Sequence, residues 1–149
     1  MIVRPAAPSD LDEIREMLRE YQAWLQVDLC FQGFEKELAE LPGDYAPPRG
    51  RLLIAEGAGC IALRPIDNEI CEMKRLFVRP THRGSGLGRT LVEAIIEEAR
   101  GIGYRRMRLD TMPVMGGAQK LYESLGFRDI VAYRYNPEHG ARFMELEML

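Results

Sequence analysis

The sequence predicts a single α/β domain whose strands and helices mix hairpins with crossovers. The first observation is size, because 149 residues with 46% hydrophobic content are enough for one domain with a real core. The second is periodicity, since apolar residues at helical spacing alternate along the chain with short strand-like runs. The third is continuity, because no repeat, linker or low-complexity segment divides the sequence. We therefore expect one domain over residues 1–149.

The charge balance narrows the classes of partner. A net charge of −3 does not suggest a general basic surface for nucleic acid. The basic residues cluster instead at 74–89 and 100–108, which favours an anion site inside a mildly acidic protein.

Cysteine usage and hydropathy indicate the compartment. Cys30, Cys60 and Cys71 are odd in number and lack C-x-x-C or histidine spacing, so we expect buried thiols in a reducing compartment and no metal site. The N-terminus has no signal-like apolar run, and no apolar stretch approaches membrane length. We expect a cytoplasmic protein without a membrane partner.

The first half of the chain is expected to supply two helices and four strands. A short strand over residues 2–4 precedes a helix with Pro8 in its first turn, and a shorter helix stops at Pro42. Strands over residues 51–55 and 60–64 form a hairpin, and a longer strand covers residues 69–79. The apolar helix faces comprise Leu11, Ile14, Leu18, Tyr21 and Leu25, then Phe34, Leu38 and Leu41.

The second half alternates helices and strands. A helical pattern runs from Leu87 to Ile102 and stops at Gly103. A strand over residues 106–111 leads to a helix over residues 118–125 that Gly126 caps in the left-handed conformation. Two last strands are expected over residues 129–135 and 143–148.

The most informative stretch is the passage from the central strand to the long helix, residues 73–89. Its apolar end, residues 76–78, turns into a basic, glycine-rich loop before the helix begins. Unpaired N–H groups and the positive helix dipole at such a point bind anionic phosphate. The spacing is not that of a dinucleotide fingerprint, and no Lys-Ser/Thr pair follows as in a P-loop. On this pattern alone a tight structural turn remains the alternative.

Two motifs in the right order resemble the GCN5-related N-acetyltransferase (GNAT) superfamily over nearly the whole chain. The first is Arg83-x-x-Gly86-x-Gly88 after the strand, and the second is Ala118-x-x-Leu121-Tyr122-x-x-x-Gly126-Phe127. The resemblance implies a mixed, mostly antiparallel sheet of about six to seven strands with a V-shaped split, and four helices packed on both faces. It also implies an acetyl-CoA-dependent N-acetyltransferase that needs no metal.

The resemblance also assigns the coenzyme site. The backbone of Leu76, Phe77 and Val78 would pair with the pantetheine arm at a strand that bulges in this family. Met115 stands where many members have an asparagine that contacts this arm. The pyrophosphate would lie on backbone N–H groups of the loop, with charge added by two arginines, so that the loop set comprises Arg83, Gly84, Ser85, Gly86, Leu87, Gly88 and Arg89.

Acetyl transfer from a thioester to an amine needs a proton donor for the leaving thiolate and a base for the amine. Tyr122 matches the family's proton-donating tyrosine, and the alternative is an aromatic residue that packs one helix face. Glu72 is the candidate base on the central strand, where alternation places it on one face with Lys74, Leu76 and Val78.

Several alternatives accompany this assignment. Glu72 could instead form a buried salt bridge with Lys74 or Arg64, and Glu69 or water could serve as the base. The oxyanion of the tetrahedral intermediate would accept a hydrogen bond from a backbone N–H, that of Phe77 or Val78. His82, His139 and Cys71 have no triad-like partner, so none of them is expected to be catalytic.

The acceptor is expected between the segment of residues 26–34 and the last hairpin, residues 133–143. Arg64 and Arg75 could hold a substrate carboxylate through bidentate contacts, or pair on the surface with Glu69 or Glu72. A small amine such as an amino acid is the first expectation. A protein lysine or N-terminal amine, or a catalytically silent acetyl-CoA sensor, is the alternative. Other candidate cleft residues are Phe31, Gln32, Tyr135, Asn136 and Arg142. The strand over residues 143–148 offers an edge for a homodimer.

Overall fold

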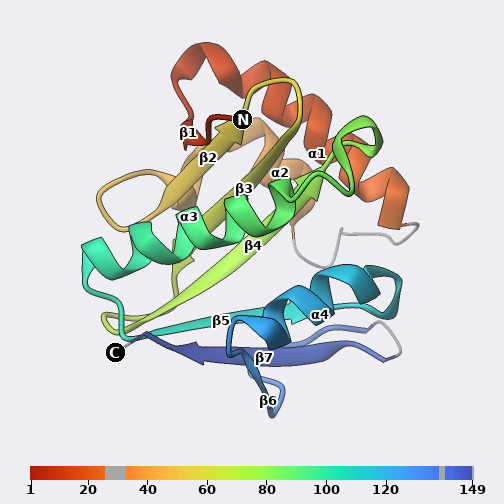
Figure 1. The fold of residues 1–149 in the computed structure, drawn as a ribbon. Coiled ribbons are helices and arrows are strands. Elements are labelled where there is room, and N and C mark those ends of the chain that lie inside the picture. The colour runs from red at the N-terminus through yellow and green to blue at the C-terminus, as the bar shows by residue number, and fades with distance from the viewer. Residues whose placement is uncertain (26–32, 138–139, 149) are drawn as a thin grey trace.

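The strands form one sheet in the computed structural model, which describes residues 1–25, 33–137 and 140–148. Within these residues the sheet has seven strands in the order β1-β2-β3-β4-β5-β7-β6 (Figure 1). The strands are β1 (Arg4–Pro5), β2 (Arg51–Ala55), β3 (Gly59–Pro65), β4 (Ile70–Val78), β5 (Arg106–Thr111), β6 (Arg128–Ile130) and β7 (Arg142–Glu147). The mixed, mostly antiparallel sheet that the sequence analysis expected is confirmed.

The sheet splits between its two central strands. β4 and β5 are parallel, and their pairing covers only Ile70 to Glu72 on β4. Beyond that point β4 stays paired with β3 while β5 stays paired with β7, so the two halves diverge as a V (Figure 1). The V-shaped split is therefore present, and its open end exposes backbone of β4 that a ligand can pair with.

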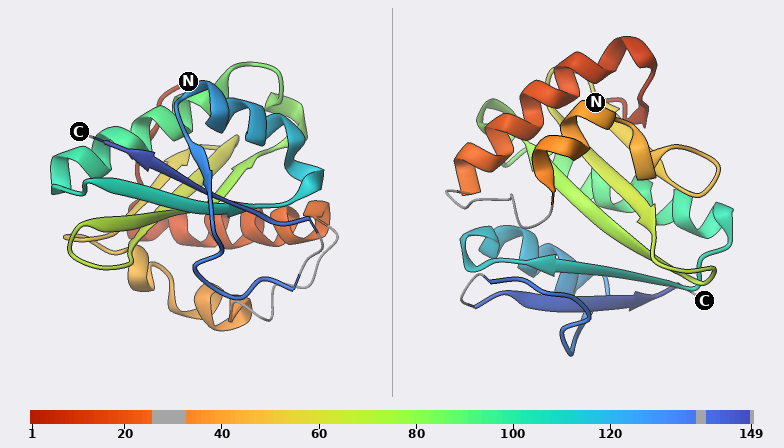
Figure 2. Two further views of the ribbon diagram at one scale, coloured as in Figure 1. Left: turned by 90° about the horizontal axis from the view of Figure 1, so that it is seen from below. Right: turned by 180° about the vertical axis from the view of Figure 1, so that it is seen from behind.

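Two helices cover each face of the sheet (Figure 2). The apolar stripes of α1 and α2 pack on one face and enclose a core that includes Phe77. The stripe of α3 packs on the other face with residues of β2 to β5. The helices are α1 (Leu11–Leu25), α2 (Phe34–Glu40), α3 (Leu87–Ile102) and α4 (Gly116–Ser124).

A bulge in β4 reverses the face that its side chains point to. Cys60 is opposite Phe77, whereas Ala62 is opposite Lys74, so two residues of β4 stand against one residue of β3. Arg75 takes the first bulge position with φ of 61°, a left-handed conformation that costs a non-glycine residue about 1–3 kcal/mol. The bulge that the resemblance implied is present.

The bulge also corrects the predicted alternation of this strand. Glu72 and Lys74 lie close together on the face covered by α1 and α2, as expected. Leu76 and Val78 pack into the opposite core with α3, so the prediction that they share the face of Glu72 is wrong. The extra residue shifts the period of two by one position, and consecutive Lys74 and Arg75 are both buried.

The C-terminal strands differ most from the predicted boundaries. β6 ends at Ile130 rather than at residue 135, and the following segment carries the side chains of Tyr133 and Arg134 to Glu72. β7 is paired with β5 along its length and with β6 from Phe143 to Glu145. The expectation of a free dimerisation edge over residues 143–148 is therefore wrong for these three positions. The remaining predicted helices and strands lie within about two residues of the observed ones.

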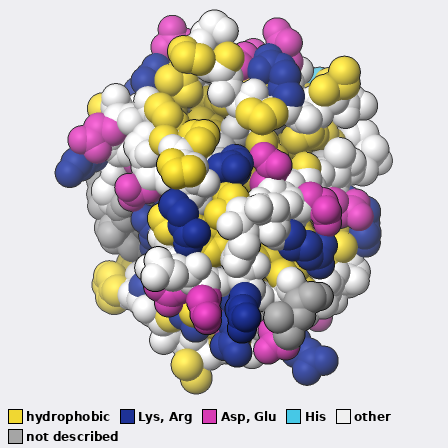
Figure 3. Space-filling model, turned by 90° about the vertical axis from the view of Figure 1, so that its left-hand side faces the viewer, with side chains coloured by type: hydrophobic (Ala, Val, Ile, Leu, Met, Phe, Trp, Pro, Cys, Tyr) yellow, Lys and Arg dark blue, Asp and Glu magenta, His cyan; other side chains and the backbone are white. Residues whose placement is uncertain are grey.

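Two other expectations concern thiols and surface charge. Cys60 and Cys71 are buried free thiols, as predicted, and Cys30 lies outside the described residues. Basic and acidic side chains are interspersed on the face drawn in Figure 3. Among the described residues, no helix is long and apolar enough to cross a membrane.

Candidate active site

A groove of about 310 Å³ opens between the end of β4, the start of α3 and the start of α4. Most of the loop positions predicted from the sequence line it, together with residues that the sequence analysis did not assign. Its lining comprises Trp24, Leu76, Phe77, Val78, His82, Arg83, Gly84, Gly86, Leu87, Gly88, Met115, Gly117, Ala118 and Leu121.

One end of this groove is the N-terminus of α3. Gly84 and Gly86 have φ values of 79° and 87°, a region that other residues rarely adopt. The first N–H of the helix to bond back into it belongs to Thr90, which donates to the Gly86 carbonyl. No side chain of the described residues caps the helix start, so the N–H groups of Leu87 to Arg89 remain available to an anion.

Arg83 is held beside these N–H groups. Its Nε donates to the Val78 carbonyl at 3.0 Å, and its guanidinium carbon lies 4.6 Å from the ring centroid of Trp24. Trp24 was missed in the sequence because it continues the polar-facing positions of α1 and carries no local motif. The pair fixes a positive charge at the mouth of the groove.

Two of the predicted loop residues lie elsewhere. The Ser85 hydroxyl donates to the His82 carbonyl, and Arg89 donates to the Ser124 hydroxyl at 3.0 Å. Neither side chain lines the groove. Their predicted contribution is therefore limited to backbone N–H groups and to long-range charge.

The middle of the groove follows the open edge of β4. In the described part of the chain, β5 pairs with β4 no further than Glu72 opposite Arg108. Beyond Glu72, the edge of β4 that faces the split is therefore not paired with a strand of the described residues. An extended amide chain can pair with such an edge as an added strand.

The inner end of the groove meets a small chamber of about 20 Å³ in the split. Leu76 and Met115 line both cavities, so the two are neighbours. The chamber is also lined by Tyr21, Met73, Lys74, Arg75, Asp110, Met112 and Tyr122. Burial raises the pKa of Tyr122 above its usual value, which keeps its hydroxyl protonated at neutral pH.

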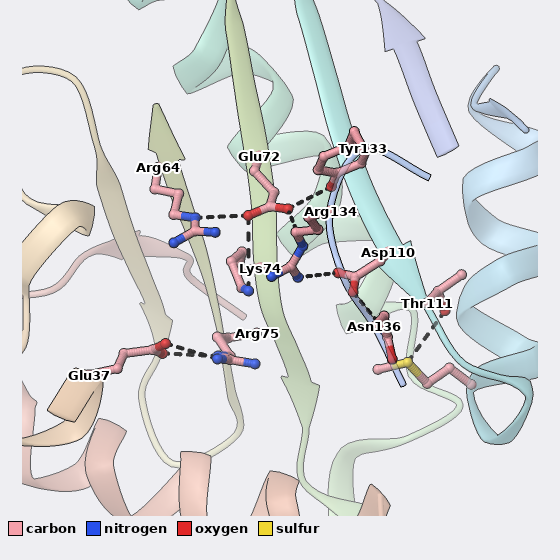
Figure 4. A network of polar contacts seen from close by, with 11 residues as sticks. Glu37, Arg64, Glu72, Lys74, Arg75, Asp110, Thr111, Tyr133, Arg134 and Asn136 are labelled. Atoms are coloured by element: carbon pink, nitrogen blue, oxygen red, sulfur yellow. Dashed lines mark hydrogen bonds and ion pairs between the residues drawn. The ribbon is translucent and has the colours of Figure 1, made fainter. Parts of the chain in front are cut away.

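Glu72 is the centre of a charged cluster beside the chamber (Figure 4). Its Oε1 accepts a hydrogen bond from Arg64 Nε at 2.8 Å, and its Oε2 accepts one from the Tyr133 hydroxyl at 2.6 Å. Lys74 Nζ lies 3.9 Å from Oε1, and Arg134 Nε lies 3.2 Å from Oε2 without hydrogen-bond geometry. The carboxylate is fully buried and surrounded by cations.

A second carboxylate of the chamber is held in a similar way. Asp110 accepts from Arg134 at 2.7 Å and from Asn136 at 2.9 Å. Burial opposes the charge of Asp110, but Arg134 outweighs it, so the pKa of Asp110 is lowered. Tyr133, Arg134 and Asp110 carry no local motif, and they become neighbours of Glu72 only through the fold.

The structure places the residues predicted to bind the acceptor in different environments. Arg75 is buried, and its guanidinium donates two hydrogen bonds to the Glu37 carboxylate, at 2.8 and 2.9 Å. The bidentate contact predicted for a substrate carboxylate is therefore made to Glu37. Arg64 is partly exposed and lines a second cavity of about 310 Å³ beneath α2, together with Lys36 and Glu37. Tyr135 is 74% exposed.

The other predicted acceptor residues contribute less. Asn136 is bonded to Asp110, and Arg142 makes surface contacts with Asp129 and Glu123. Phe31 and Gln32 lie outside the described residues. Among the residues that are described, no group of three His, Cys, Asp or Glu side chains could hold a metal ion.

Comparisons with known proteins show the family of the chain. Residues 11–127 match the acetyltransferase (GNAT) family. An uncharacterised N-acetyltransferase of Schizosaccharomyces pombe is 40% identical over 95% of this chain and 90% of its own length. An acetyltransferase structure from Streptococcus agalactiae superposes with a TM-score of 0.79 at 24% identity and covers 98% of this chain and 97% of that one.

A further solved structure shares the fold. It is an acetyltransferase from Salmonella typhimurium with its cofactor acetyl-CoA, with a TM-score of 0.70 at 23% identity, covering 99% of this chain and 94% of that one. The family match and the split sheet identify the class of protein as an N-acetyltransferase. The chain belongs to the acetyltransferase (GNAT) family, whose acetyl donor is acetyl-CoA.

Proposed function

We propose that this protein transfers an acetyl group from acetyl-CoA to the primary amine of a small, carboxylate-bearing molecule such as an amino acid. The amine attacks the thioester directly while both substrates occupy the split. The observation that carries this proposal is a pair of neighbouring cavities in the split: a groove from the N-terminus of α3 to the end of β4, and a chamber lined by Tyr122. Holding both reactants there can contribute about 7–11 kcal/mol toward the barrier.

The coenzyme follows the groove in three parts. The pyrophosphate accepts hydrogen bonds from N–H groups at the start of α3, next to the positive charge of Arg83. The pantetheine arm pairs with the edge of β4 that β5 leaves unpaired beyond Glu72. The thioester then reaches the chamber, where a backbone N–H near the bulge is the proposed donor to the oxyanion.

Tyr122 is the proposed proton donor to the departing thiolate. Its side chain lines the chamber from α4, on the far side of the split from β4. Its raised pKa supports a protonated hydroxyl at neutral pH, which a donor requires. Tyr122 also packs as an aromatic core residue, since its ring centroid lies 5.6 Å from that of Phe127.

The geometry favours a positioning role for Glu72 over the role of base. Both of its oxygens already accept hydrogen bonds, and two further cations lie close by. Glu72 is also not among the described residues that line the chamber. A carboxylate held in this way orients Arg64 and Arg134 but is poorly placed to take a proton from an incoming amine.

Arg64 supports the carboxylate-bearing acceptor. Its Nε is fixed on Glu72, while its side chain keeps a third of its surface exposed and lines the cavity beneath α2. A guanidinium anchored through Nε presents its terminal nitrogens to a carboxylate. Arg75, the other predicted candidate, is already bound to Glu37 and is assigned to structure.

The test is an amine panel with detection of free thiol. The panel pairs each amino acid with the amine that lacks its carboxylate, and we expect the amino acid to have the higher kcat/KM. The preference for the amino acid is its kcat/KM divided by that of the matched amine. Arg64→Gln should reduce this ratio about tenfold, as expected for the loss of one charge-assisted hydrogen bond. Arg51→Gln is the control, because Arg51 lies on the neighbouring strand and pairs with Glu98.

The opposing outcomes are distinct. Equal rates with and without the carboxylate, or an unchanged ratio in Arg64→Gln, would contradict the acceptor class. Stabilisation by acetyl-CoA with no turnover of any amine would indicate a coenzyme-binding sensor instead. Turnover confined to peptides that contain lysine or a free N-terminus would indicate a protein acceptor.

A further inference from the structure

Lys74 occupies an unusual place for a lysine. The chain has three lysines, and Lys36 and Lys120 are exposed, whereas Lys74 is only 6% exposed and lines the chamber. It projects from β4 toward the same cavity that Tyr122 lines from α4. The bulge at Arg75 places both consecutive basic side chains on this face of the strand.

Three ion pairs of described residues surround Lys74. Arg64 pairs with Glu72 at 2.8 Å, Arg75 pairs with Glu37 at 2.8 Å, and Arg134 pairs with Asp110 at 2.7 Å (Figure 4). We call these three pairs, together with Lys74, the chamber cluster. Arginine stays protonated in proteins, so the formal charge of the cluster is zero when Lys74 is neutral and +1 when it is protonated.

Among the described residues, tyrosines are the further titratable groups of the chamber and its cluster. Tyr21 of α1 and Tyr122 of α4 line the same chamber, Tyr133 donates to Glu72, and Tyr45 lies beside the Arg75–Glu37 pair. Their pKa values are all raised by burial, so they stay neutral near pH 7 and add no charge to the cluster.

This environment weakens the affinity of Lys74 for a proton. Burial is the largest cause and the positive charge of Arg75 is the second, and together they lower the pKa of Lys74 to about 7. Glu72, at 3.9 Å, acts in the opposite direction and stabilises the ammonium once it forms. A general base is most effective when its pKa lies near the working pH.

We propose that Lys74 is the general base, and that its neutral Nζ takes a proton from the ammonium of the acceptor. This inference rests on the proposed acetyltransferase activity and adds a catalytic residue to it. The freed amine then forms the C–N bond, the C–S bond breaks, and Tyr122 donates its proton to the sulfur. The second proton of the nitrogen restores the Tyr122 hydroxyl, and Lys74 returns its proton to solvent after the product leaves.

The first test needs no acceptor. The chain is labelled with ¹³Cε-lysine, and the three lysine resonances are followed between pH 5 and 11. We expect one resonance to titrate near pH 7, to vanish in Lys74→Met and to persist in Lys120→Met. If the Lys74 resonance titrates instead near the ordinary lysine value of about 10.4, the proposal is overturned whatever the enzyme acetylates.

The second test separates a base from a fixed positive charge. With any acceptor that the amine panel identifies, kcat/KM of the wild type should rise with pH through about 7, because the base must be neutral. Lys74→Met and Lys74→Arg should both lose kcat by about 10²–10⁴-fold and lose that rise, while the Kd of acetyl-CoA stays unchanged. Lys120→Met is the control.

Lys74→Arg decides between the two roles. An arginine keeps the charge but cannot become neutral, so near-normal kcat in this variant would overturn the proposal in favour of a cation that stabilises the oxyanion. A pH profile that keeps its rise near pH 7 in Lys74→Met would also overturn it. Should no amine be turned over, the proposed function fails, and the lysine titration still tests the neutral state by itself.

Discussion

The coenzyme groove and the chamber cluster lie on either side of one bulge but are built in different ways. The groove is formed largely by one continuous stretch, the end of β4 and the loop that enters α3, and it offers mainly backbone N–H groups. The chamber cluster draws side chains from α2, β3, β4, β5 and the segment after β6. Binding of a constant coenzyme therefore depends on local backbone, whereas the chemistry and the acceptor depend on long-range side-chain contacts.

The largest effect should come from the point where the two regions meet. Tyr122→Phe removes the proposed proton donor but keeps the ring that packs against Phe127. We expect kcat to fall by about 10²–10⁴-fold with the Kd of acetyl-CoA changed less than about threefold. Steady-state kinetics with thiol detection and isothermal titration of acetyl-CoA measure the two quantities.

A buried tyrosine outside the split is the matched control. Tyr104 donates to the Arg49 carbonyl at 2.9 Å and lies in the core under α3. Tyr104→Phe should lower stability by about 1 kcal/mol and leave kcat unchanged. An unchanged kcat in Tyr122→Phe would remove this residue from the chemistry and leave the packing role.

The second effect concerns the stability of the chamber cluster. Glu37→Gln leaves the buried guanidinium of Arg75 without its carboxylate, and breaking a buried pair in this way costs about 3–5 kcal/mol. We expect the free energy of unfolding to fall by that amount in urea titrations. Glu35→Gln on the exposed face of the same helix should change it by less than about 0.5 kcal/mol.

The same pair predicts an acid dependence. Burial is the largest single influence and tends to raise the pKa of Glu37, but the hydrogen bond and charge of Arg75, with smaller contributions from Tyr45 and Lys74, together lower it overall. A lowered pKa in the folded state contributes stability above the unfolded value of about 4.3 that is lost as the pH falls through the folded value. The stability gap between wild type and Glu37→Gln should thus narrow below about pH 4. A gap independent of pH would show that the carboxylate charge is not what stabilises Arg75.

The third effect tests the backbone of the groove. Gly86 precedes α3 with φ of 87°, and a side chain in this left-handed region costs about 1–2 kcal/mol. Because no heavy atom lies within 4 Å of an added Cβ, the strain arises from φ alone. Gly86→Ala should raise the Kd of acetyl-CoA about tenfold while kcat at saturation changes little.

Another glycine of the same helix provides the opposite expectation. Gly101 is exposed near the end of α3 and does not have a positive φ. Gly101→Ala should stabilise the protein by about 0.4–1 kcal/mol and leave the Kd unchanged. Equal effects of the two substitutions on the Kd would argue against a specific role of the Gly86 turn.

The contrast between the regions also explains what the sequence could predict. Most of the helices and strands follow from periodicity and turn residues, and eight of the fourteen residues that line the groove follow from the motif at its start. Arg75 defeats the alternation argument because a single residue with positive φ moves every later side chain of β4 to the other face. No local pattern marks such a residue, since arginine rarely adopts this conformation.

The cluster was less predictable for a different reason. Glu72 and Arg134 are 62 positions apart, and their contact depends on where β6 ends and how the following segment returns to the split. The strand pattern expected to reach residue 135 instead stops at Ile130, because Tyr133 and Arg134 turn toward two buried carboxylates. A lysine between a glutamate and an arginine on an otherwise apolar strand was the one local signal of this site.

The smallest effect separates two arginines that sequence alone treats as equals. Both are exposed, but Arg83 is tied to the Val78 carbonyl and to Trp24 beside the N–H groups of α3, whereas Arg89 is bonded to Ser124. Arg83→Gln should weaken acetyl-CoA about tenfold, as expected for one charge-assisted contact, and added salt should reduce the difference.

Arg89→Gln should change the Kd by less than about twofold, since exposed pairs contribute about 0–1 kcal/mol. Titration of both variants with acetyl-CoA and with S-acetylpantetheine, a thioester that carries no phosphate, measures the two Kd values. The loss in Arg83→Gln should disappear with the ester, because that ligand lacks the pyrophosphate. If the two arginines weaken acetyl-CoA equally, charge anywhere near the start of α3 is sufficient, and the fixed position of Arg83 over Trp24 contributes nothing to binding.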